Sequence, residues 1–224
     1  MPIYHFEPSL QQVGSFAPTA TIEQIAEEVG IYSASPNFIR DNGGPLTNAI
    51  LDQIPSDWFA EAEDLGLYPN IDVRVHRLYK DDFPAVPGWH CDGEYRKTYH
   101  SQPELDKIVM HRHIVGTVST SPTGVSLTEF VTDPLSVEID ESGNAGVWEQ
   151  VHRHIDKVGP TIVEAQDGAL YDFGSMTLHR CAPAKERGWR LFLRASMWHK
   201  PYLQGEGTIA RQEYVYRLSE EKGW

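Results

Sequence analysis

Apolar residues recur with two different periods along this chain, a helical period in the first third and a period of two in the remainder. Residues 1–68 contain three segments in which apolar positions return every three or four residues, the spacing of one helix face. Each segment opens on residues typical of a helix start, namely Thr21 with Gln24 three positions later, Pro45, and Pro55–Ser56. The pattern predicts a helical N-terminal segment over residues 1–68, covering one face of a sheet.

From about Asn70 onward, apolar positions alternate with polar ones, as they do in half-buried β-strands. Runs of this kind, divided by Gly, Pro and Asp, cover residues 71–76, 108–120, 124–131, 159–165, 169–173 and 189–198. Many short strands without intervening helices are typical of an antiparallel sandwich or jelly roll. We therefore predict a mainly β fold.

The length of the chain, 224 residues, suits a single all-β domain. We expect one domain over residues 1–224, made of the helical cover at 1–68, a jelly-roll core at 69–200 and a C-terminal extension at 201–224. Two long polar stretches, residues 93–106 and 133–158, are expected as loops over the open end of the core.

Composition narrows the class of protein and of partner. Apolar residues are 40% and charged residues 23% of the chain, as in soluble globular proteins. No apolar run approaches the roughly 18 residues of a membrane span, and the N-terminus lacks signal-peptide features, so we expect a cytoplasmic protein without a membrane partner. The formal charge of -13 disfavours nucleic acid as a partner.

Cys91 and Cys181 are expected as buried, reduced thiols. The sequence carries no signal for oligomeric state.

His90 and Asp92 are the first candidate metal ligands. They follow Pro87–Gly88, a turn signal, and residues i and i+2 of an extended strand point to the same side. A third ligand must come from a distant part of the chain, and His179 is the candidate, because the long gap after Asp92 allows several strands to intervene. Two histidines and one carboxylate are the ligand set of non-haem Fe(II) centres with open positions.

The His-x-Asp spacing alone is weak evidence, since the chain has a second copy at His154 and Asp156. No turn leads into that copy, which lies in a polar stretch close to His179. We interpret it as a surface feature.

The segment 189–198 gives the clearest alternation in the chain. Its odd positions are all apolar, whereas Arg190, Arg194 and Ser196 share the opposite face. Such a face is either exposed to water or lines a cavity that holds an anion, and guanidinium groups are suited to a bidentate grip on a carboxylate.

The order His90-x-Asp92, a long gap, His179, and then an arginine eleven residues later resembles the Fe(II)/2-oxoglutarate-dependent dioxygenases, with the phytanoyl-CoA hydroxylase-like branch nearest. The resemblance rests on two segments, Pro-Gly-Trp-His-Cys-Asp before the gap and His179 to Gly188-Trp189-Arg190 after it. It covers roughly residues 70–198 and leaves out both ends of the chain.

The resemblance implies a double-stranded β-helix, a jelly-roll barrel, with iron held by His90, Asp92 and His179. Arg190 would bind the distal carboxylate of 2-oxoglutarate. Some branches use an Arg-x-Ser pair there, which Arg194-Ala-Ser196 fits; otherwise Arg194 is the candidate for an acidic group of the substrate. The implied enzyme consumes O2 and 2-oxoglutarate, releases succinate, and hydroxylates a small molecule, an amino acid or a peptide.

Two other functions fit parts of the sequence. A cupin-type metalloprotein would use the pair His111 and His113, or the pair His152 and His154, and would not consume 2-oxoglutarate. A non-catalytic jelly-roll binding protein would carry the ligand set by coincidence.

Overall fold

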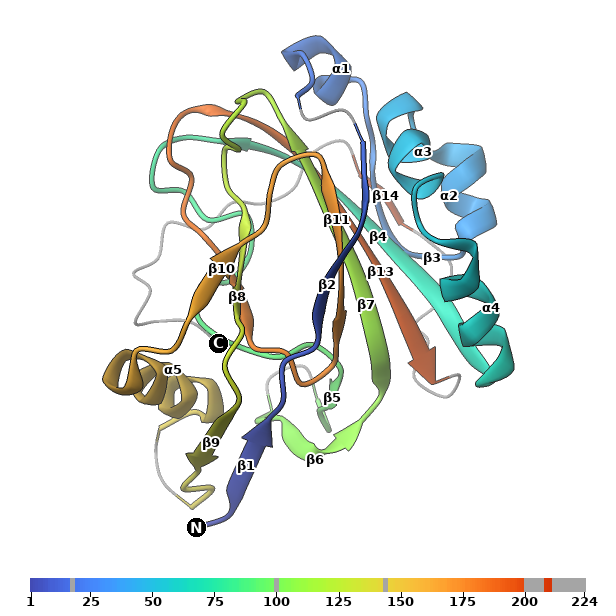
Figure 1. The fold of residues 1–224 in the computed structure, drawn as a ribbon. Helices are drawn as coiled ribbons and strands as arrows, with labels where there is room; N and C mark the ends of the chain where they lie inside the picture. Colours follow the sequence, from blue (N-terminus) through green and yellow to red (C-terminus); the bar gives the residue numbers. More distant parts are fainter. Residues whose placement is uncertain (17–18, 99–100, 143–144, 200–207, 211–224) are drawn as a thin grey trace.

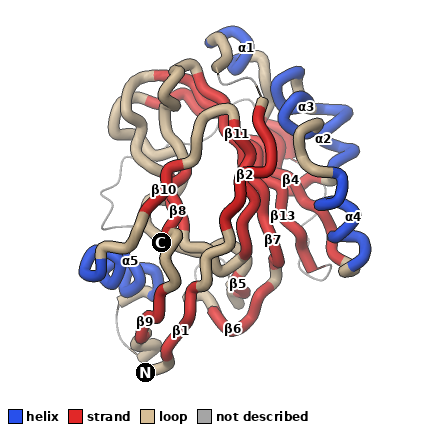
Figure 2. Tube along the Cα trace, in the orientation of Figure 1, coloured by secondary structure: helices blue, strands red, loops and turns tan. Residues whose placement is uncertain are grey.

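Strands dominate the computed structural model of the chain, which describes residues 1–16, 19–98, 101–142, 145–199 and 208–210 (Figure 1). Every strand pair within these residues is antiparallel. The strands form a jelly-roll-like sandwich with helices on its outside (Figure 2). The prediction of a mainly β, jelly-roll fold is confirmed.

The larger sheet contributes one wall of the sandwich. It has seven strands in the order β14-β3-β4-β13-β7-β11-β2. Their bounds in that order are Thr208–Ala210, Gly30–Ala34, Leu67–Leu78, Gly188–His199, Met110–Ser119, Ala169–Gly174 and Leu10–Ser15. Strand β13 lies at the centre and pairs with β4 on one side and β7 on the other, so its inward side chains stand in the middle of the wall.

The opposite wall is made of shorter strands. A three-stranded sheet, β10-β8-β12, consists of Ile162–Glu164, Thr128–Val131 and His179–Cys181. Two further strand pairs form separate two-stranded sheets, β1-β9 (Ile3–Phe6 with Leu135–Glu138) and β5-β6 (Glu94–Tyr95 with Glu104–Ile108). Phe130 of β8 packs against Tyr171 and Phe173 of β11, which joins the two walls through an aromatic core.

Four helices cover the outer face of the larger sheet: α1 (Ile22–Ala26), α2 (Pro36–Asn42), α3 (Pro45–Leu51) and α4 (Ser56–Asp64) (Figure 1). Leu191, Leu193 and Ala195 of β13 point into the apolar core beneath them and are fully buried. Because side chains of a strand alternate, the polar set of β13 must point the other way, into the space between the walls.

A fifth helix, α5 (Val147–Val158), covers the smaller wall (Figure 1). Trp148, Val151 and Ile155 are buried in a cluster that also contains Trp89 and Leu178, the residues directly before His90 and His179. The helix therefore supports the backbone that carries these two histidines. No helix in the described part of the chain is long and apolar enough to cross a membrane.

The three helices predicted near Thr21, Pro45 and Pro55 are confirmed as α1, α3 and α4. Thr21 and Gln24 form the expected capping box, with N···O distances of 3.2 and 2.8 Å. Helix α2 was not predicted.

The prediction that residues 1–68 are helical was wrong for β1, β2 and β3. Strand β2, Leu-Gln-Gln-Val-Gly-Ser, is an edge strand with few apolar residues, so its conformation is set by pairing with β11. The loop prediction for residues 133–158 was also wrong, because the segment contains β9 and α5. Apart from β14, the C-terminal extension at 201–224 lies outside the described residues.

Candidate metal centre

A two-residue β-bridge brings His90 and His179 side by side. The backbone N–H of His90 donates to the carbonyl of His179 at 3.0 Å, and that of His179 donates to the carbonyl of His90 at 2.9 Å. Residues directly opposite each other in an antiparallel pair carry their side chains on the same side. The ring centroids accordingly lie 4.6 Å apart, although a long stretch of sequence separates the two residues.

The Nδ1 atoms of both histidines form hydrogen bonds to backbone carbonyl groups. Nδ1 of His90 donates to the carbonyl of Gly88, and Nδ1 of His179 donates to the carbonyl of Thr177, each at 2.9 Å. A carbonyl oxygen can only accept, so the proton of each neutral ring sits on Nδ1 and the lone pair on Nε2. Burial, followed by the neighbouring His179, lowers the pKa of His90 to about 4. Both Nε2 atoms are thus available as metal ligands.

Asp92 lies beside the two histidines and completes a group of three possible metal ligands. One ligand atom from each of His90, Asp92 and His179 lies within 4.8 Å of the other two, and the three residues are the one such group of metal-ligating side chains found among the described residues. Oδ2 of Asp92 lies 3.4 Å from Nε2 of His179. The three predicted ligands therefore meet in space, in a combination that can hold a divalent metal ion.

Arg194 lies beside the carboxylate of Asp92. Its Nη1 donates to Oδ2 of Asp92, and its Nη2 donates to Oδ2 of Asp72 at 2.8 Å. Burial raises the pKa of Asp92, but the charge of the neighbouring Arg194 and the proximity of His179 and His90 outweigh it, so that its pKa lies well below the usual value. A substrate acid would have to displace one of these two carboxylates. The predicted substrate-binding role of Arg194 stays a prediction, and we favour a role in orienting Asp92.

His113 fixes the backbone of Asp92 and was not predicted to belong to this site. Its Nε2 donates to the carbonyl of Asp92 at 3.2 Å, and its Nδ1 accepts from Oγ of Ser196 at 2.8 Å. The ring is fully buried and stacks on Phe173, with centroids 5.1 Å apart. Only the strand register, which pairs His113 with Ser196, would have linked this histidine to the site.

Gly93 turns the chain away directly after Asp92. Its φ is +110°, and a Cβ there would lie 2.7 Å from the carbonyl oxygen of Met110. The Met110 oxygen belongs to the backbone and cannot move aside easily, because this segment is fixed to Gly93 by hydrogen bonds. The carbonyl of Gly93 accepts from the N–H groups of Val109 and Met110 at 2.6 and 3.2 Å. A residue other than glycine would therefore require both a strained conformation and movement of this strand.

We expect Gly93→Ala to lower the free energy of unfolding by about 3 kcal/mol, the sum of backbone strain and a steric clash, as measured by urea denaturation. Gly66→Ala is the matched control, because Gly66 has a positive φ of 65° but open space around its Cβ. The control should lose only about 1 kcal/mol. Equal losses in the two variants would contradict a close approach at Gly93.

A cavity of about 270 Å³ opens onto the three candidate ligands. Its lining comes from both walls and from the loop after β4: Arg74, His76, Pro84, Ala85, Val86, His90, Asp92, Val115, Thr128, His179, Arg180, Cys181, Arg190, Phe192 and Arg194. The polar face predicted for β13 therefore lines a cavity. The described residues of the two expected lid segments, 93–106 and 133–158, are absent from this lining.

Arg190 is buried in this cavity with no charged partner. Its side chain is 3% exposed and its guanidinium lies over the ring of Phe192, 4.7 Å from the centroid. Among the residues that the structure describes, Arg190 forms no ion pair and its Nε has no hydrogen-bond partner. Asp167, whose charge acts on Arg190, accepts hydrogen bonds from Ser119. Burial lowers the pKa of Arg190 to about 10, so it remains a cation at neutral pH.

The competing histidine pairs do not form a site within the described residues. His111 is exposed, and both ring nitrogens of His113 form hydrogen bonds, one to the carbonyl of Asp92 and one to Oγ of Ser196. His152, His154 and Asp156 all lie on α5, where residues two apart point to different sides of the helix. The side chains of His154 and Asp156 therefore cannot bind the same metal ion. Cys91 and Cys181 are buried free thiols, as expected.

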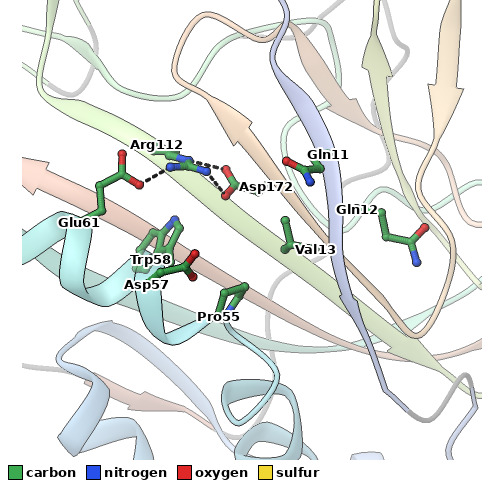
Figure 3. A pocket seen from close by; sticks show the side chains of 9 residues that line it. All are labelled: Gln11, Gln12, Val13, Pro55, Asp57, Trp58, Glu61, Arg112 and Asp172. Carbon is green, nitrogen blue, oxygen red and sulfur yellow. Dashed lines mark hydrogen bonds and ion pairs between the residues drawn. The ribbon is translucent and has the colours of Figure 1, made fainter.

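A larger cavity, about 340 Å³, lies away from the candidate ligands, between α4 and the β7-β11-β2 part of the sheet (Figure 3). Arg112 is one of its lining residues and forms a bidentate pair with Asp172, with N···O distances of 2.8 and 2.7 Å, and a further contact with Glu61. The charge of Arg112 is therefore paired with carboxylates of the protein, in contrast to that of Arg190.

No family model matches the chain, and no curated protein matches it in sequence. Two solved structures share part of its backbone arrangement. AviO1 from Streptomyces viridochromogenes Tue57 is 12% identical with a TM-score of 0.42, over 90% of this chain and 94% of that one. EvdMO1 is 15% identical with a TM-score of 0.34, over 59% of this chain, which spans only 27% of the EvdMO1 chain. Neither similarity is close enough to indicate function.

Proposed function

We propose that the protein is a non-haem Fe(II)- and 2-oxoglutarate-dependent oxygenase. One observation carries this proposal: the buried, unpaired guanidinium of Arg190 lines the same cavity as His90, Asp92 and His179. A buried cation without an ion pair among the described residues is costly, so an anion is expected beside it when the protein is in its working state. A metal site and an anion site in one cavity fit a carboxylate co-substrate that reaches from the cation to the metal.

The spacing along β13 supports this arrangement. Arg190 and Arg194 point to the same side of the strand, about 13 Å apart along its length, and Arg194 touches Asp92. Arg190 therefore marks the end of the cavity away from the candidate ligands. In our proposal, one carboxylate of 2-oxoglutarate binds to Arg190 and the opposite end of the molecule faces the metal.

His90, Asp92 and His179 would hold the iron through two neutral Nε2 atoms and one carboxylate oxygen. Bound iron supplies the activation of O2, which no side chain of the protein can perform. The protein contributes orientation, through the Nδ1–H bonds of the histidines and the contacts of Arg194 and His113 with Asp92. Val115 and Phe192 in the cavity lining limit access of water.

The size of the cavity supports a small substrate. A volume of about 270 Å³ suits a small metabolite, an amino acid or the end of a peptide beside the co-substrate. We propose hydroxylation as the reaction, in the cytoplasm, without nucleic acid or membrane as partner.

Succinate release tests the proposal. Purified protein with Fe(II) and 2-oxoglutarate in air should form succinate slowly on its own and faster with the true substrate, which a panel of amino acids, peptides and metabolites would identify. A metal chelator should abolish the reaction, because the ligands act only through the ion. Iron binding without any consumption of 2-oxoglutarate would instead favour the cupin-type alternative.

A further inference from the structure

His76 shares the cavity with Arg190 and has no role in the site as described so far. It lies on β4, directly opposite Arg190 of β13 in the strand register, and both side chains line the same cavity. Residues directly opposite each other in a sheet are within reach of one small ligand. The two side chains therefore face the same end of the cavity.

Neither ring nitrogen of His76 is satisfied within the described part of the chain. The residue is fully buried, and both Nδ1 and Nε2 lack a hydrogen-bond partner. The backbone of Pro84 lies near the ring but makes no hydrogen bond of acceptable geometry. Buried histidines normally bond to a neighbouring group, and an unsatisfied ring costs free energy. Because the imidazole has no partner among the described residues and lines the cavity beside Arg190, we expect its partner to be a ligand bound in that cavity.

The surroundings keep this imidazole neutral. Burial, followed by the charges of Arg190 and Arg74, holds the pKa of His76 well below its usual value. A neutral imidazole offers one N–H donor and one acceptor nitrogen. It can therefore bond to an anion held by Arg190 without adding a second buried charge.

We propose that His76 is a second anchoring residue of the anion end, donating a ring N–H to the carboxylate that Arg190 binds. The inference rests on the proposed function, which supplies 2-oxoglutarate as the carboxylate. The guanidinium of Arg190 would neutralise the charge of the carboxylate, and the N–H of His76 would fix its orientation. Together they would set the position of the bound molecule relative to the metal. His76 thereby also selects for a dicarboxylate over a monocarboxylate oxoacid.

Two variants test the role of His76. His76→Leu removes both nitrogens with little change in volume, and His76→Gln restores one N–H near the position of Nε2. Glutarate, a dicarboxylate without the keto group, serves as the probe in metal-free protein with a chelator present. We expect the dissociation constant for glutarate to rise by about tenfold to a hundredfold in His76→Leu, the effect of one hydrogen bond to a charged group. His76→Gln should recover most of the affinity.

The stability of the ligand-free protein separates anchoring from a structural role. Because His76→Leu removes two unsatisfied polar atoms, its thermal midpoint without ligand should equal or exceed that of the wild type. His152→Leu is the matched control, since His152 also has a buried, unpartnered Nδ1 but lies on α5 away from the cavity. The control should bind glutarate like the wild type.

In the iron-loaded enzyme, His76→Leu should raise the KM for 2-oxoglutarate by a similar factor while kcat changes less than threefold or so. Unchanged glutarate affinity in His76→Leu, no glutarate binding by the wild type, or a loss of affinity matched by a loss of thermal stability would each overturn the inference. Failure of the oxygenase proposal has a different signature, namely no iron-dependent succinate whatever the affinity for glutarate.

Discussion

Asp92→Ala is expected to reduce iron-dependent succinate formation to the background of the metal-free protein. The substitution removes the one carboxylate of the candidate ligand set and leaves two neutral histidines, which bind Fe(II) more weakly than the full set of two histidines and one carboxylate. Loss of groups that merely support a ligand typically costs 10- to 100-fold in metal affinity, so loss of the ligand itself should cost more than about 100-fold. Succinate release and calorimetric titration with Fe(II) under nitrogen measure the two effects.

The fold should survive this substitution, because Arg194 keeps Asp72 as its partner at 2.8 Å. Asp156→Ala is the matched control: it removes the carboxylate of the second His-x-Asp copy, which is exposed on α5. The control should retain wild-type turnover and iron affinity. Normal turnover in Asp92→Ala would show that the metal, if any, is held elsewhere.

Arg190→Met is expected to raise the KM for 2-oxoglutarate by roughly 30-fold or more. Truncating one partner of a buried, hydrogen-bonded charge pair costs about 2–5 kcal/mol, and every 1.4 kcal/mol is a factor of about ten. The metal ligands are unaffected, so iron affinity in the absence of 2-oxoglutarate should stay at the wild-type value. Steady-state kinetics with varied 2-oxoglutarate, together with iron titration, separate the two quantities.

The stability of Arg190→Met gives a second, independent readout. Because the guanidinium is buried and unpaired, its removal should leave the free energy of unfolding unchanged or raise it, whereas removal of a paired buried arginine would lower it by about 3–5 kcal/mol. Arg187→Met serves as the control, since Arg187 is exposed and lies near Tyr79. An unchanged KM in Arg190→Met would argue against 2-oxoglutarate as the ligand of this cavity.

The alternation within single strands was enough to predict the central wall. In β13 the apolar residues do face the helices and the polar ones the interior, as the period of two requires. Helix α5 carried a comparable signal, with Val147, Trp148, Val151 and Ile155 at helical spacing, but its many charged residues led to a loop prediction. Strands β1 and β2 had no such signal, because their partners β9 and β11 decide their conformation.

The candidate ligands could be predicted because their order along the chain is distinctive, whereas the groups around them could not. His113 and His76 are ordinary members of alternating strands, and only the register places one opposite Ser196 and the other opposite Arg190. The partner of Arg194 likewise depends on the register that sets Asp72 beside it. Register is a property of paired strands, so a single sequence does not reveal it.

The backbone bridge between His90 and His179 has a consequence for how an ion is captured. Two imidazoles fixed by the same pair of main-chain hydrogen bonds are already in place before any ion arrives, so little conformational entropy is lost when the ion binds. Asp92 follows the bridge instead of belonging to it, and the side chain of Arg194, not a main-chain pair, holds its carboxylate. In the proposed centre, the two histidines would therefore form the preorganised part of the ligand set, and Asp92 would be its more adjustable member.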